Sequence, residues 1–74
     1  MSSEHIIQAA ERARSLLRDR SEVESVGVSR GKDGNLCVRV DVEPGTDKDR
    51  ILSLLGRINV PVIVRTVSGR LIAH

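Results

Sequence analysis

Two runs of alternating apolar and polar residues, separated by a short glycine-containing loop, constrain this chain more than any other feature. Val26 and Val28 alternate with Ser25, Gly27 and Ser29, while Leu36, Val38, Val40 and Val42 alternate with Cys37, Arg39 and Asp41. A period of two is typical of strands with one buried face and one open face. The sequence therefore predicts a β-hairpin whose valines pack on one side and whose other side meets water or a partner.

The loop Lys32-Asp33-Gly34 fixes how the two strands pair. These residues suit a three-residue hairpin in which a type I turn ends on a left-handed glycine. This geometry predicts Val28 opposite Val38 and Val26 opposite Val40 on the packed side, with Ser29 opposite Cys37 and Gly27 opposite Arg39 outside. A shift of one residue would expose the valines to water, so the register is strongly specified.

The N-terminal segment is predicted to form an amphipathic helix from Glu4 to about Asp19, capped by Ser2 or Ser3. Its apolar residues at helical spacing are Ile6, Ala9, Ala10, Ala13, Leu16 and Leu17. The alanine-rich stripe allows a close approach to a sheet.

A second, shorter helix should follow the Pro44-Gly45 stop, with Thr46 as its cap. Its apolar positions at i, i+3, i+4 and i+7 are Ile51, Leu54, Leu55 and Ile58. Gly56 is predicted to be the left-handed residue that ends the helix.

The last strand is predicted to begin near Val60. Val60, Val62 and Val64 should face one way and Ile63, Arg65 and Val67 the other. Pro61 favours an edge position or the first rungs of a strand. Ser68-Gly69 allows a turn, after which residues 70–73 could add a short terminal strand.

This order of elements predicts an α+β fold, an αββαβ two-layer sandwich with both helices on one face of a mainly antiparallel three-stranded sheet. We expect the sheet order 2-1-3, in which a right-handed crossover places the last strand beside the first. Such an arrangement resembles a ferredoxin-like fold that lacks its first strand.

The length of 74 residues predicts a single domain over 1–74. Aromatic residues make up 0% of the chain, so the core must be built from Val, Ile, Leu and Ala. A small core of this kind favours help from a partner subunit.

Neither a secretory signal nor a run of the ~20 apolar residues that cross a bilayer is evident in the sequence. We therefore expect a cytoplasmic protein without membrane contact, unless a signal was trimmed.

The sequence offers no signature of catalysis, metal binding or cofactor binding. His5 and His74 lie at opposite ends of the chain, and Cys37 has neither a CxxC partner nor an HxxxH motif nearby. The segment Gly31-Lys32-Asp33-Gly34 lacks the spacing of a phosphate-binding loop and joins two strands. We therefore expect a non-enzymatic protein without cofactor or metal.

Two segments carry a resemblance to a known family: VESVGV at residues 23–28 and INVPVIVRTVSGRLIA at residues 58–73. They resemble the small αββαβ module that precedes trypsin-like protease domains in some bacterial proteins. The chain has no GDSGG-type nucleophile motif, so proteolysis does not carry over. The resemblance implies a bacterial accessory or interaction module and says nothing about a substrate.

The open side of the sheet is the predicted interaction surface. It combines small residues, which allow close approach, with the apolar and arginine side chains common in interfaces. The candidate residues are Gly27, Ser29, Cys37, Arg39, Ile63, Arg65 and Val67. We expect an interaction or assembly domain, with a homodimer through this face or a sheet edge as the simplest form.

The alternative is nucleic-acid binding through Arg39 and Arg65 together with first-helix arginines such as Arg14 and Arg18. The net charge of +2 is spread along the chain instead of being concentrated in one run, and no aromatic side chain is present to stack on bases. The alternative therefore rests on phosphate contacts, which predict binding that weakens steeply as salt rises.

Overall fold

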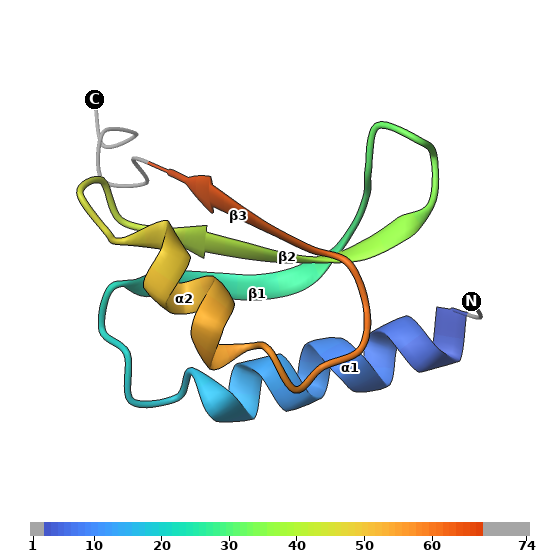
Figure 1. The fold of residues 1–74 in the computed structure, drawn as a ribbon, viewed down its shortest axis with the longest axis horizontal. Helices are drawn as coiled ribbons and strands as arrows, with labels where there is room; N and C mark the ends of the chain where they lie inside the picture. The colour runs from blue at the N-terminus through green and yellow to red at the C-terminus, as the bar shows by residue number, and fades with distance from the viewer. Residues whose placement is uncertain (1–2, 68–74) are drawn as a thin grey trace.

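The computed structural model describes residues 3–67 and forms an αββαβ arrangement. The elements are α1 (Ser3–Leu16), β1 (Val23–Arg30), β2 (Leu36–Val42), α2 (Lys48–Leu54) and β3 (Val62–Thr66). The strands form one three-stranded sheet, and both helices lie on the same side of it (Figure 1). The predicted α+β class and element order are confirmed, whereas the predicted strand at 70–73 lies outside the described residues.

The β1–β2 hairpin has the predicted register. Val26 pairs with Val40, Val28 with Val38, Gly27 with Arg39 and Ser29 with Cys37. In the loop, Gly34 has a φ of 83°, the left-handed value that glycine adopts without strain. The Asp33 carboxylate accepts hydrogen bonds from the backbone N–H and from the side-chain amide of Asn35. These bonds, the backbone one first, hold the pKa of Asp33 below its ordinary value.

The predicted strand order 2-1-3 is wrong, because β2 and not β1 is the central strand. The order is β1-β2-β3, with β1 antiparallel and β3 parallel to β2, so the sheet is mixed. β2 is the strand suited to the centre, since Val38, Val40 and Val42 are completely buried. β1 bears small polar residues on its open side and lies at an edge.

The core fills the space between the sheet and the helices. Its buried members are Ala10, Ala13, Leu17, Val38, Val40, Val42, Ile51, Leu55 and Ile58. Ile6 is also fully buried, whereas Leu16, which the helical pattern placed inside, is 42% exposed. The core is therefore aliphatic throughout, and the alanines of α1 let that helix approach β1 and β2 closely.

The ends of both helices differ from the predictions. α1 ends at Leu16 and not near Asp19, because residues 17–19 form a turn. α2 is capped by Asp47, whose carboxylate accepts hydrogen bonds from the Asp49 and Arg50 N–H groups. Thr46 instead donates its hydroxyl to the Glu43 carbonyl at 2.7 Å. This bond closes a turn before the helix begins.

The predicted left-handed glycine after α2 is also misplaced. Gly45 has a positive φ of 86°, as position i+2 of a turn with Pro44 at i+1 requires, whereas Gly56 does not have a positive φ. Leu55 forms the C-cap of α2 at a φ of −97°. The chain then passes through Ile58 and Pro61 into β3, which starts at Val62, two residues later than predicted.

Candidate functional site

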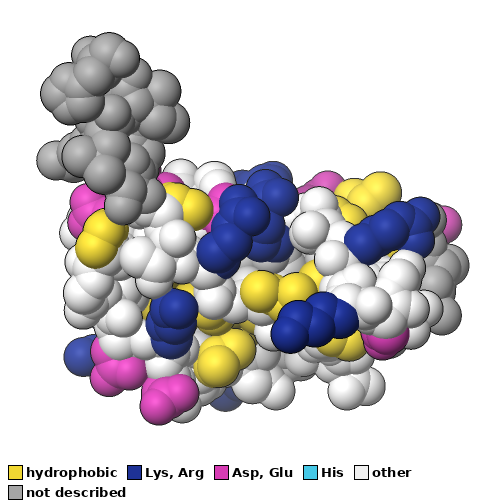
Figure 2. Space-filling view, turned by 90° about the horizontal axis from the view of Figure 1, so that it is seen from above, with side chains coloured by type: hydrophobic (Ala, Val, Ile, Leu, Met, Phe, Trp, Pro, Cys, Tyr) yellow, Lys and Arg dark blue, Asp and Glu magenta, His cyan; other side chains and the backbone are white. Residues whose placement is uncertain are grey.

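The side of the sheet away from the helices is the predicted interaction surface, and we call it the open face. Pairing across β1, β2 and β3 brings Gly27 beside Arg39, and Arg39 beside Ile63. Ile63 is 40% exposed. Figure 2 looks onto this side and shows apolar side chains between groups of basic ones. Val67 follows β3 directly and donates its N–H to Val42 O at 2.9 Å.

A carboxylate that the predicted residue set omitted lies at the centre of the open face. Asp41 on β2 is only 6% exposed. Its Oδ1 accepts a hydrogen bond from Arg65 Nε at 3.2 Å, and its Oδ2 accepts one from the Ser25 hydroxyl at 2.9 Å. Arg39 Nε lies 3.3 Å from the same Oδ2, an ion pair without hydrogen-bond geometry. One buried carboxylate thus holds two arginines from neighbouring strands.

This network leaves the open face with more positive than negative charge. Asp41 supplies one negative charge against the two guanidinium groups of Arg39 and Arg65, whose side chains are 32% and 57% exposed. Both contacts to Asp41 are made through Nε, so the terminal nitrogens of Arg65 remain available to an outside acceptor. The arrangement holds both guanidinium groups in place, and their remaining N–H groups can donate to carbonyl or carboxylate oxygens of a partner.

Gly27 gives Arg39 room to lie across β1. A Cβ built on Gly27 would come within 3.3 Å of Arg39 Nη2. Because the contact is with the end of a flexible side chain, a larger residue at this position would displace the guanidinium instead of breaking the strand. Gly27 therefore helps to set the position of Arg39 on the open face.

Cys37 shares the open side of β2 with Arg39 and Asp41 but is only 2% exposed. The predicted set placed it among the interaction residues, and the register agrees, because Cys37 pairs with Ser29 as expected. Its burial means that the thiol acts as a small packing residue beneath the surface. A partner on the open face would meet Ile63, Arg39 and Arg65 before it met Cys37.

The structure separates the proposed nucleic-acid residues into two groups. Arg39 and Arg65 lie on the open face, whereas Arg14 on α1 and Arg18 in the turn after α1 line a groove beside β1. Arg14 connects the two layers, because its Nη2 donates to the Val26 carbonyl at 2.9 Å. No feature of the sequence pattern indicated this bond, which depends on how α1 crosses the sheet.

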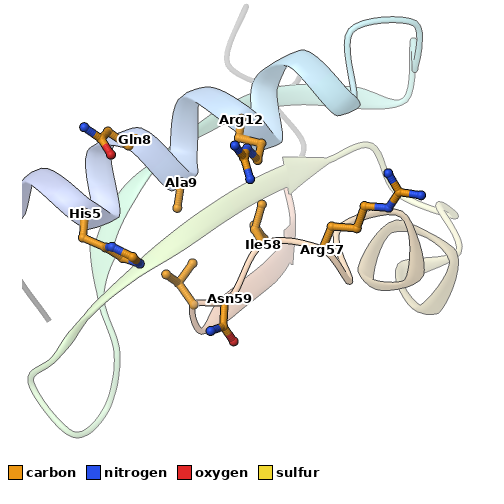
Figure 3. A pocket seen from close by; sticks show the side chains of 8 residues that line it. His5, Gln8, Ala9, Arg12, Arg57, Ile58 and Asn59 are labelled. Atoms are coloured by element: carbon orange, nitrogen blue, oxygen red, sulfur yellow. The ribbon is translucent and has the colours of Figure 1, made fainter.

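A second hollow lies between α1 and the segment that leads from α2 to β3 (Figure 3). It measures about 270 Å³, with Ala9, Ile58 and Val60 as its apolar part and five polar residues around them: His5, Gln8, Arg12, Arg57 and Asn59. Figure 3 shows Arg57 extending away from the hollow and Arg12 reaching toward Ile58. This volume is slightly below the ~300 Å³ at which small-molecule sites begin.

Within residues 3–67, no three His, Cys, Asp or Glu side chains are grouped so that they could hold a metal ion. The same part of the chain contains no helix of the length and apolar character needed to span a bilayer. Comparisons of the chain with protein-family models, with curated proteins and with solved structures found no match.

Proposed function

We propose that this chain is a small non-catalytic interaction module that self-associates through its open sheet face. The observation that carries the proposal is the arrangement around Asp41, which fixes Arg39 and Arg65 beside the exposed Ile63. Fixing long side chains before binding reduces the entropy lost when an interface forms. Arginine and aliphatic anchors on a surface of small residues are typical of interface centres.

The aliphatic core supports an oligomer in particular. A chain of 74 residues without aromatic side chains buries little apolar area per residue, and association adds to what the core supplies. The αββαβ element order supports the accessory role that the resemblance to bacterial modules implies. A single buried cysteine fits a reducing compartment such as the cytoplasm.

Sedimentation equilibrium of the full chain tests this proposal. We expect a dimer at high micromolar concentration and a shift to monomer in Ile63→Lys, because the new charge would be buried at the interface. Leu52→Lys on α2 is the matched control, since Leu52 is 41% exposed and Ile63 is 40% exposed. A strict monomer for the unmodified chain would contradict self-association, and a dimer that persists in Ile63→Lys would place the interface elsewhere.

Nucleic-acid binding remains the second candidate because Arg14, Arg18 and Arg20 line one groove. A titration with single-stranded RNA and duplex DNA at low salt tests it. Binding that weakens steeply as salt rises would support this function. No binding to either polymer would exclude it.

A further inference from the structure

The outer edge of β1 carries main-chain groups that its pairing with β2 does not use. At the loop end of the hairpin, the Gly31 N–H donates to Asn35 O at 2.8 Å. Bonded and non-bonded pairs alternate along an antiparallel ladder, so every second residue from Gly31 bonds to β2. Val26, Val28 and Arg30 therefore direct their N–H and C=O groups away from β2, toward the open edge.

Two other bonds agree with this assignment. Val38, which pairs with Val28, donates its N–H to Pro61 O at 3.0 Å, on the β3 side of β2. The Val26 carbonyl accepts the 2.9 Å bond from Arg14 Nη2, which reaches it from α1. β1 is eight residues long, and apart from the Val26 carbonyl its outward main-chain groups at Val26, Val28 and Arg30 are open to an added strand.

A basic groove of about 320 Å³ runs beside the first half of this edge. Arg14, Arg18 and Arg20 line it, together with one acidic residue, Glu24. Leu17, which is 3% exposed, provides an apolar wall. The groove and the edge are continuous, because Val26 belongs to both. An extended chain laid along β1 would therefore place alternate side chains among three guanidinium groups.

We propose that β1 binds an extended acidic peptide segment of another protein, which adds to the sheet as a fourth strand. Main-chain bonds to Val28, to Arg30 and to the Val26 N–H supply affinity, while the Val26 carbonyl stays bonded to Arg14. Carboxylates facing Arg14 and Arg18 supply selectivity. This site is separate from the open face and goes beyond the self-association proposed above.

Charge disfavours a second copy of this chain at the same edge. Consider an antiparallel β1–β1 pair centred near Gly27 or Val28. Arg30 and Lys32 of the second copy would then lie beside the basic groove of the first copy. Like charges placed this way repel. Nucleic acid could satisfy the arginines but could not pair in strand register with the main-chain groups of β1. An acidic peptide satisfies both features.

The test uses the full chain labelled for NMR and a blocked peptide of alternating Glu and Val, as long as the eight-residue β1. We expect sub-millimolar binding at low salt, with the largest amide shifts at Val26, Val28 and Arg30. The matched peptide of alternating Lys and Val should bind at least about tenfold more weakly, because three arginines repel it. An oligouridylate of similar length is titrated in parallel.

Two variants locate the site. Arg18→Glu should weaken binding of the Glu-Val peptide about fivefold or more, whereas the control Arg57→Glu, in the other hollow, should change it less than about twofold. Val28→Pro removes an outward N–H and leaves the β1–β2 ladder bonds in place, so the variant should fold and lose binding. If this variant fails to fold, the Arg18→Glu comparison decides.

Three results would overturn the proposal. They are no binding up to about 1 mM peptide, equal binding of the Lys-Val peptide, or shifts confined to Ile63 and Arg65 on the open face. Stronger binding of the oligouridylate than of the Glu-Val peptide would also overturn it and would favour nucleic acid. Sedimentation equilibrium measures only the mass of the assembly, whereas the NMR titration measures peptide binding. Self-association and peptide binding can therefore fail independently of each other.

Discussion

At the residue scale, Asp41 organises the surface on which the proposed function depends. Its carboxylate is buried and accepts from Ser25, while arginines from β2 and β3 compensate its charge. A buried carboxylate without such partners would be costly, so Asp41 and the two arginines depend on each other. The open face is therefore pre-formed by a network inside this one chain.

This network makes Asp41→Asn a sensitive substitution. We expect a loss of about 1–2 kcal/mol in the free energy of unfolding, less than for a fully buried pair because Arg39 and Arg65 remain partly solvated. Urea denaturation measures the change. Asp19→Asn, on an exposed turn, is the control and should stay within about 0.5 kcal/mol of the unmodified chain. Equal stabilities for the two variants would mean that Asp41 does not hold the arginines.

At the element scale, the sequence pattern predicted the hairpin well and the helix ends poorly. The register of β1 and β2 could be predicted because the loop ending in Gly34 and the valine alternation both favour one pairing. The same register places Ser25 opposite Asp41, so this part of the network could have been found from the sequence. The burial of Asp41 could not, because it depends on Arg65 arriving from β3.

Helix caps were harder to predict because neighbouring residues offered the same chemistry. Thr46 and Asp47 can both cap a helix, and the structure uses Thr46 in the preceding turn and Asp47 at the cap. The strand order was mispredicted for a related reason. A crossover through α2 can return beside β1 or beside β2, and alternation alone does not show which strand has a neighbour at both of its edges.

The cap assignment predicts unequal effects for two aspartates at the start of α2. Asp47→Ala should cost about 1 kcal/mol in the free energy of unfolding, because two N–H groups lose their acceptor. Asp49→Ala should cost about 0.5 kcal/mol or less, since Asp49 contributes through its charge near the helix start. Thermal unfolding followed by circular dichroism compares them. A larger loss for Asp49→Ala would contradict the cap.

At the scale of the whole molecule, both proposals follow from where β2 lies. With β2 in the centre and both helices on one side, the structure leaves an open face and a β1 edge for partners (Figure 1). The open face combines the Asp41 network with Ile63, and the edge combines main-chain groups with a basic groove. If β1 were central, as the sequence pattern first indicated, its edge would be occupied and the peptide site would not exist.

Amide hydrogen exchange at Val28 and Val38 tests this arrangement most directly. The two residues face each other across β1 and β2, and neither N–H bonds to the other strand. The Val38 N–H, on the central strand, has an acceptor on its other side in Pro61 O, whereas the Val28 N–H points to the open edge. We predict slow exchange at Val38, which donates to Pro61 O, and fast exchange at Val28 in the peptide-free protein. Slow exchange at Val28 with fast exchange at Val38 would contradict the central position of β2 and the open edge of β1.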